Sequence, residues 1–335
     1  MKYLLELAKD HETLLKSEIM ACLKSEDINY KILTKNNDVI IFESNSENDK
    51  IKNFANRISS IYFVDDFLFE SPLIISKIHN SAIKNPIKNP GSIAVKYKNR
   101  SKSVNSQEII KTVASVYTKN RKVRLKKPDI EIRCIITDDR VYVGMKLFQI
   151  DRQQFEKRKV QFRPFFSPIS LHPKLARALV NLSGVKKNHT LLDPFCGTGG
   201  ILLEAGLIGI KVIGNDIEQK MIDGCKKTLD FYKINEYNLF CSDVGDINKY
   251  VSKIDAVVTD LPYGKSTTTK GEEKKNLYKR SFEIISNVMS KNTKAVIGFS
   301  DKNMISLAEN YLKFVESHEL KVHKSLTRYF VVFEK

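Results

Sequence analysis

The residues best suited to chemistry form a short stretch, D-L-P-Y-G, at positions 260–264. An exocyclic amine on a base is a weak nucleophile, because its lone pair is delocalised into the ring. Two acceptors that hold its two N–H groups would favour a pyramidal nitrogen with its lone pair free to attack. The carboxylate of Asp260 and the carbonyl of Leu261 can supply those acceptors. Pro262 would make the turn rigid, and Tyr263 offers a ring on which a flipped base can stack.

A second stretch, T-L-L-D-P-F-C-G-T-G-G at residues 190–200, predicts a ligand-binding loop between a strand and a helix. Leu202 replaces the third glycine of a dinucleotide fingerprint, and no lysine follows as in a phosphate-binding loop. The carboxylate of Asp193 would repel a phosphate but suits a ligand that carries positive charge. The loop therefore favours S-adenosylmethionine, with candidate contacts from Asp193, Phe195, Cys196, Gly197, Thr198 and Gly199.

Two further acidic residues follow predicted strands. Asp216 ends the segment V-I-G-N-D about 20 residues after the glycine loop, where a carboxylate commonly accepts from ribose hydroxyls. Ile217 beside it could pack on an adenine ring. Asp243, in C-S-D-V, could accept from the adenine amino group, and a helix N-cap is an equally good explanation.

The elements that must position these residues alternate from Thr190 onward. We expect strands at residues 190–192, 211–214, 238–241, 254–259, 295–299, 321–323 and 329–333, with helices at 201–207, 219–232, 277–289 and 303–312. This pattern predicts an α/β fold with a seven-stranded, mostly parallel sheet closed by a C-terminal hairpin. Upstream, residues 1–70 predict a small α+β module of ferredoxin-like pattern, and residues 71–150 predict a second α+β module.

Composition excludes several classes of protein. The chain has 335 residues with 42% hydrophobic content, enough for about two domains. No uncharged apolar run approaches the ~18 residues of a membrane span, and the N-terminus does not resemble a signal peptide. Five scattered cysteines without a C-x-x-C motif predict reduced thiols, with no disulfide and no metal site. We therefore expect a cytoplasmic protein.

Positive charge is concentrated in the middle of the chain. The formal net charge is +17, and residues 71–160 hold 21 Lys and Arg against 7 Asp and Glu. A lysine-rich solvated surface explains part of this excess, but its concentration favours a nucleic-acid interface. The expected contacts to RNA backbone are Arg121, Lys122, Arg124, Lys126, Lys127, Arg158 and Lys159.

Two resemblances support this interpretation. The segment V-R-L-K-K-P-D at residues 123–129 resembles the V-x-L-x-x-P-D signature of THUMP domains, which are small RNA-binding modules. Residues 150–264 closely resemble THUMP-containing tRNA methyltransferases, above all the archaeal tRNA guanosine-10 N2-methyltransferases. The matching segments are D-P-F-C-G-T-G-G-I-L-L-E-A, D-L-P-Y-G, F-E-K-R-K-V-Q-F-R-P-F-F-S-P and H-P-K-L-A-R-A-L-V-N-L. One departure is that many amino-methyltransferases carry N-P-P-Y, so Asp260 could act as a base or only as an acceptor.

The resemblance implies a Rossmann-like methyltransferase fold, S-adenosylmethionine as cofactor and tRNA as substrate, and we expect a monomer. The predicted domains are a ferredoxin-like module (1–70), a THUMP domain (71–150), a linker (151–172) and a methyltransferase domain (173–335). Three alternatives stay open: N2-methylation of guanine at another tRNA position or in rRNA, methylation of adenine in DNA, and an RNA-binding protein with an inactive catalytic domain. The DNA enzyme would not need the basic module, and the intact acceptor motif disfavours the inactive domain.

Overall fold

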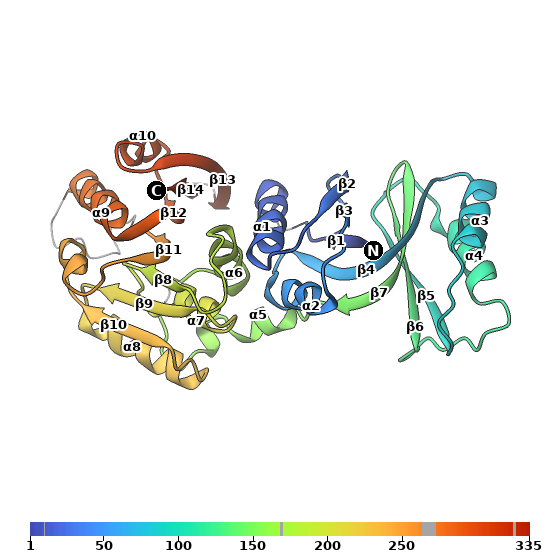
Figure 1. The fold of residues 1–335 in the computed structure, drawn as a ribbon, viewed down its shortest axis with the longest axis horizontal. Helices are drawn as coiled ribbons and strands as arrows, with labels where there is room; N and C mark the ends of the chain where they lie inside the picture. Colours follow the sequence, from blue (N-terminus) through green and yellow to red (C-terminus); the bar gives the residue numbers. More distant parts are fainter. Residues whose placement is uncertain (10, 168–169, 263–272, 324–325) are drawn as a thin grey trace. The chain divides into compact units, whose positions relative to one another are not determined.

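The computed structural model describes residues 1–335 except 10, 168–169, 263–272 and 324–325. The chain forms two compact units, whose elements are labelled in Figure 1. The N-terminal unit contains Met1–Asp10, Ile28–Ala55 and Ile61–Asp151, and the C-terminal unit contains His11–Asp27, Asn56–Ser60 and Arg152–Lys335. In the described part of the chain, no helix is long and apolar enough to cross a membrane.

The N-terminal unit is built on one sheet of seven strands in the order β2-β3-β1-β4-β7-β6-β5. The strands are β1 (Lys2–Leu7), β2 (Lys31–Lys35), β3 (Val39–Glu43), β4 (Ile61–Pro72), β5 (Ile93–Asn99), β6 (Ile130–Ile136) and β7 (Arg140–Gln149), and the helices are α3 (Ile75–Lys84) and α4 (Ser106–Tyr117). Ile78 of α3 and Val113 of α4 pack in one apolar cluster with Ile132 of β6.

The predicted division at residue 70 is wrong. β4 runs through this position and pairs with β1 on one side and with β7 on the other. The two expected modules therefore share a single sheet, because one long strand completes the hydrogen-bond ladders of both.

Two other boundaries also differ from the prediction. Helix α1 (Glu12–Ser25) belongs to the C-terminal unit, and α2 (Asn48–Arg57) crosses the division between the units. The expected linker at 151–172 also belongs to the C-terminal unit and contains α5 (Gln153–Lys157) and a short 3₁₀ helix, η1 (Val160–Phe162). Phe155 of α5 is fully buried, so packing holds this segment despite its prolines.

The C-terminal unit is an α/β sandwich around a second seven-stranded sheet, ordered β10-β9-β8-β11-β12-β14-β13. Its strands are β8 (Thr190–Asp193), β9 (Lys211–Asp216), β10 (Tyr237–Cys241), β11 (Ile254–Asp260), β12 (Met289–Phe299), β13 (Lys313–His323) and β14 (Leu326–Glu334). The helices are α6 (Pro173–Leu182), α7 (Gly200–Gly206), α8 (Gln219–Phe231), α9 (Lys274–Val288) and α10 (Met304–Ala308), with a 3₁₀ helix η2 (Val244–Lys249). The first five strands in this order are parallel, and β14 pairs antiparallel with β12 and β13.

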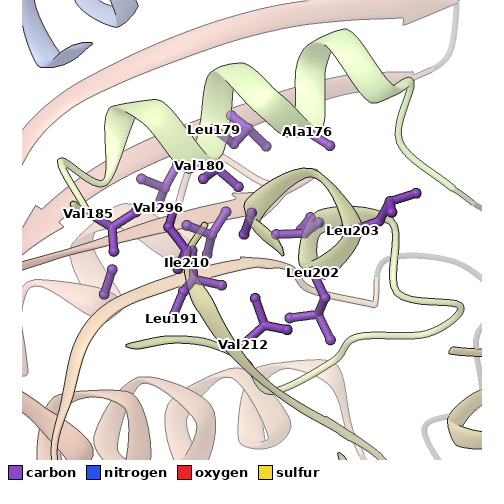
Figure 2. Packing of buried hydrophobic residues seen from close by; sticks show 14 of the residues in the cluster. Ala176, Leu179, Val180, Val185, Leu191, Leu202, Leu203, Ile210, Val212 and Val296 are labelled. Atoms are coloured by element: carbon purple, nitrogen blue, oxygen red, sulfur yellow. The ribbon is translucent and has the colours of Figure 1, made fainter. Parts of the chain in front are cut away.

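Alternate residues of the central strands enter two different cores, as the two-residue period of a strand requires. Leu191, Val258 and Val296 belong to the cluster formed with α6, α7 and α8, in which Figure 2 labels Leu191 and Val296. Their neighbours Leu192 and Val257 belong to the cluster formed with α9 and α10. Such burial on both faces explains the nearly continuous apolar strands in the sequence.

A buried ionic cluster joins the predicted linker to α6 and α7. The carboxylate of Glu204, fully buried in α7, accepts from Arg158 (Nε–Oε1 2.7 Å, Nη2–Oε2 3.0 Å) and from Arg177 of α6 (Nη2–Oε2 2.9 Å). Arg158 is only 7% exposed. The prediction that Arg158 contacts RNA is therefore wrong, because its guanidinium is committed to an internal carboxylate.

We predict that Glu204→Gln lowers the free energy of unfolding by about 3–5 kcal/mol, since it leaves two buried guanidinium groups without their anion. The matched control is Glu156→Gln, which removes a half-exposed carboxylate that pairs with Lys159 and should cost less than about 1 kcal/mol. Urea denaturation of both variants measures the difference. Equal stabilities would show that the cluster does not hold this region together.

Candidate active site

A cavity of about 290 Å³ lies at the carboxyl ends of the parallel strands of the C-terminal unit. Its walls come from the loops after β8, β9, β10 and β11, with Leu171, Met221 and Leu277 as apolar contributors. Of the predicted cofactor residues, the lining includes Asp193, Phe195, Cys196, Gly197, Thr198, Asp216, Ile217 and Asp243. Register explains this convergence, because Asp193 pairs beside Gly214 and Asp216 beside Cys241 in adjacent parallel strands.

The glycine loop needs its glycines for conformation. Gly197 and Gly199 have φ of 50° and 78°, in the left-handed region that disfavours side chains. A Cβ at Gly199 would also lie 2.5 Å from Sγ of Cys225 in α8. Gly199 does not line the cavity, unlike the other predicted loop residues. Its role is to let the loop turn tightly against α8.

Asp193 is buried beneath this loop, with 1% of its surface exposed. Its Oδ1 accepts from Thr259 Oγ1 at 2.7 Å and from the Phe195 amide at 3.2 Å. Burial raises the pKa of Asp193 to about 7. The sequence interpretation missed Thr259, whose signal is a polar residue at the end of an otherwise apolar strand.

Asp216 fixes the same loop from the neighbouring strand. Its Oδ2 accepts from the Gly197 amide and its Oδ1 from the Glu218 amide, both at 3.0 Å. Burial raises the pKa of this carboxyl as well. A carboxylate has about four acceptor sites, so the two amide bonds leave capacity for a ligand's hydroxyls. The carboxylate of Asp216 can therefore bind a ligand while it accepts from the amides of Gly197 and Glu218.

Asp243 has the structural role that the sequence left open. It is the N-cap of η2, where its Oδ1 accepts from the Gly245 amide at 2.8 Å. The same oxygen accepts from Nη1 of Arg280 in α9 at 2.6 Å. Arg280 was not predicted, because it lies 37 residues further along the chain.

The acceptor motif follows β11 directly. Asp260 lines the cavity and forms an ion pair with Arg328 of β14, a partner that the sequence did not indicate. Leu261 is fully buried and its amide donates to the Gly298 carbonyl at 2.9 Å. The Pro262 carbonyl accepts from Tyr278 Oη at 2.9 Å, which anchors the turn to α9. Tyr263 lies outside the described residues, and so do residues 265–272 of the Lys265–Glu273 loop, for which the sequence suggests a mobile lid.

In the N-terminal unit, the predicted RNA-contacting residues differ in exposure. Lys122, Arg124, Lys126 and Lys127 are all exposed. Arg121 instead donates to the carbonyls of Asn89 and Ile87, at 2.7 and 2.6 Å, and so braces the adjacent loop. The acidic end of the V-R-L-K-K-P-D segment is also structural, since Asp129 accepts from the amide and hydroxyl of Ser92.

Two remaining expectations concern the segment 151–172. Lys159 of the C-terminal unit is partly exposed and pairs with Glu156, so its contact to RNA stays a prediction. The sequence also suggests that Phe165 and Phe166 form a wall of the cofactor pocket, with core packing about equally likely. Neither residue is among the described residues that line the cavity. Phe165 packs against Gly224 of α8, where a Cβ would collide with its ring, and Phe166 is 62% exposed.

Two models of known protein families match parts of this chain. The family described as "RMKL-like, methyltransferase domain" matches residues 160–329, and the family described as "DNA methylase" matches residues 7–227.

Individual proteins give more specific similarities. The tRNA (guanine(10)-N2)-dimethyltransferase of Methanothermobacter thermautotrophicus is 32% identical over the full length of both chains. The protein of the same name from Pyrococcus abyssi is 36% identical over 65% of this chain and 66% of its own. Among solved structures, TrmN from Thermus thermophilus has a TM-score of 0.59 at 16% identity and covers 100% of both chains. SMU.472 complexed with SAH has a TM-score of 0.56 at 14% identity and covers 99% of this chain and 97% of its own.

The raised pKa of Asp193 predicts how stability changes with pH. In the unfolded chain this carboxyl loses its proton near pH 4, but in the folded protein near pH 7. Between these values the folded state binds more protons, so this group's contribution to stability falls as pH rises. We expect Asp193→Asn to remove a decline of at most about 4 kcal/mol between pH 4 and 7.

Urea denaturation of the protein without added ligands, at intervals from pH 4 to 8, tests this expectation. Asp230→Asn is the control, because a hydrogen bond from Lys226 lowers the pKa of this exposed carboxyl and so gives the opposite sign. A difference between wild type and Asp193→Asn that is constant with pH contradicts the assignment.

Proposed function

We propose that the cavity bounded by Asp193, Asp216 and Asp260 is the site at which this chain methylates N2 of guanosine 10. The chain belongs to the family of tRNA (guanine(10)-N2)-dimethyltransferases and is an S-adenosylmethionine-dependent enzyme of this activity. The observation that carries this assignment is the convergence of Asp193, Asp216, Asp260 and Pro262 around one cavity. The position in tRNA comes from the relatives, whereas the chemistry follows from the residues.

The cavity fits S-adenosylmethionine in size and in charge. About 290 Å³ approaches the lower range of small-molecule sites, and its carboxylates favour a ligand with positive charge. We propose that Asp216 accepts from the ribose hydroxyls and that Ile217 packs on the adenine. Asp193, buried beneath the loop, contributes negative charge below the methionine ammonium. When bound, the cofactor supplies a methyl group activated by its sulfonium.

The D-L-P-Y-G turn is placed to receive the guanine. We propose that Asp260 and the carbonyl of Leu261 hold the two N–H groups of N2, while Tyr263 stacks on the flipped base. The bond between Tyr278 Oη and the Pro262 carbonyl supports this, because it ties the turn to a buried tyrosine. Fixing both reactants in this way can remove about 7–11 kcal/mol from a bimolecular barrier. A second methylation has a single N–H left to hold, so the pocket must also admit the first methyl.

We also propose that the N-terminal unit binds tRNA through the exposed segment 122–127. Its four cations are exposed, and Val123 and Leu125 between them are 55% and 72% exposed. We further propose that the part of the N-terminal unit after β4 is a THUMP-type region of the shared sheet, and that the C-terminal unit is Rossmann-like. A monomeric state and a cytoplasmic location also belong to this proposal.

The chemistry predicts a defined product. An unmodified tRNA transcript incubated with the protein and S-adenosylmethionine should yield N2-methylguanosine and N2,N2-dimethylguanosine at position 10. Asp260→Ala should lower the single-turnover rate by about 100-fold or more, because one of the two acceptors that hold the amine is lost. Nucleoside mass spectrometry after site-specific cleavage checks both. Label on adenosine, or an alanine variant as fast as wild type, contradicts the proposed site.

The RNA-binding surface predicts a salt-dependent affinity. Replacing Lys122, Arg124, Lys126 and Lys127 with glutamine should weaken tRNA binding and reduce the slope of log affinity against log salt by about 0.7–0.9 for each phosphate that is no longer neutralised. Calorimetry should show unchanged cofactor affinity. The charge-matched control replaces four exposed lysines in and beside α8: Lys220, Lys226, Lys227 and Lys233. If both sets reduce the slope equally, the segment has no special role.

A further inference from the structure

Asp260 and Arg328 meet across a strand that lies between them. Asp260 ends β11 and is in register with Gly298 of β12, which in turn is in register with Phe330 of β14. Arg328 lies two residues before Phe330, on the same face of β14. Its Nη2 donates to Oδ2 of Asp260, so the ion pair spans the width of β12.

The absence of a side chain at Gly298 leaves room for the Asp260 carboxylate beside β12. A Cβ at this position would lie 2.5 Å from Oδ1 of Asp260 and 2.9 Å from the ring of Phe330. The missing side chain leaves the space that the Asp260 carboxylate and the Phe330 ring occupy, and the Phe330 ring lies 5.2 Å from Cζ of Arg328. A side chain at position 298 would therefore displace the Asp260 carboxylate from its place beside Arg328.

Both members of the pair are largely removed from water. Their side chains are 17% exposed for Asp260 and 8% exposed for Arg328. Burial lowers the pKa of Arg328 to about 10, so the guanidinium still carries its charge at neutral pH. Removing either partner would leave a poorly solvated charge on the other, whereas replacing both with neutral groups would not.

We propose that Arg328 is a positioning residue that neutralises Asp260, so that the pair acts as an uncharged hydrogen-bond acceptor for the substrate amine and not as a base. This inference rests on the proposed function of the same site. A carboxylate bound to a guanidinium keeps lone pairs that can accept an N–H, but the nearby cation reduces its affinity for a proton. The lone pair of guanine N2 forms the bond to the methyl carbon, the C–S bond breaks, and the surplus proton on N2 passes to water.

The inference predicts that neutralising both partners together is less harmful than neutralising one. Asp260→Asn keeps an acceptor oxygen but removes the negative charge that pairs with Arg328, and Arg328→Met removes the positive charge that pairs with Asp260. We expect each single variant to lower kcat by at least about tenfold. The double variant Asp260→Asn/Arg328→Met should recover at least about tenfold in kcat over Asp260→Asn, a coupling that independent sites do not show.

The assay is single-turnover methyl transfer to a tRNA transcript at saturating cofactor, with KM for the cofactor measured in parallel. A purely structural role would change the melting temperature and the cofactor KM, whereas a positioning role changes kcat with KM within about threefold. Arg328→Lys keeps a cation and should retain more kcat than Arg328→Met. Lys226→Met, which breaks an exposed ion pair with Asp230, is the control and should match wild type.

Three results overturn the inference. A double variant no faster than Asp260→Asn would show that the charged carboxylate itself is needed, as for a base. An Arg328→Met variant as fast as wild type, or faster, would show that the pair does not assist the acceptor. A wild-type protein that transfers no methyl group to guanine contradicts the proposed function together with this inference, whereas the first two results leave the proposed function intact.

Discussion

Four aspartates converge on one edge of the C-terminal sheet, and the fold must compensate the charge of each of them. Parallel register brings together the ends of β8, β9 and β11, with the loop after β10 beside them. Like charges this close to a partly buried cavity raise one another's free energy. Each therefore has its own partner: Thr259 for Asp193, the amides of Gly197 and Glu218 for Asp216, Arg280 for Asp243, and Arg328 for Asp260.

These different partners give the carboxylates different roles. Asp193 and Asp216 accept from neutral groups and can stabilise a cofactor with positive charge. Burial raises the pKa of Asp193 to about 7 in the protein alone, and the positive charge of a bound cofactor would favour the ionised carboxylate. Asp243 and Asp260 are paired with arginines and contribute less net charge. The negative region therefore lies beneath the cofactor loop, and the neutral acceptor lies where a base amine would enter. This division suits methyl transfer, in which positive charge moves from sulfur to the attacking nitrogen.

Local patterns in the sequence predicted the ends of the strands but not the partners across them. The glycine spacing, the acidic residue about 20 positions later and the D-L-P-Y-G turn placed Asp193, Asp216 and Asp260 around one site, because strand ends in a parallel sheet share an edge. Thr259, Arg280 and Arg328 lie 66, 37 and 68 residues from the carboxylates they contact. The periodic patterns that indicate helices and strands extend over a few residues, so they do not indicate contacts between residues this far apart in the chain. The same limit explains why Arg158 was assigned to RNA: its charge is visible in the sequence, but Glu204 beside it is 46 residues away.

The central claim is that the cavity presents its acceptors to the N2 amine of guanosine 10. The most direct measurement is single-turnover methyl transfer to two tRNA transcripts that differ at position 10 alone, one with guanosine and the other with inosine. Inosine keeps the ring and its carbonyl but lacks the exocyclic amine. Acceptors for the N2 amine at this cavity predict rapid transfer to the guanosine transcript and no transfer to the inosine transcript, with similar affinities for both. Equal labelling of the two transcripts would contradict it.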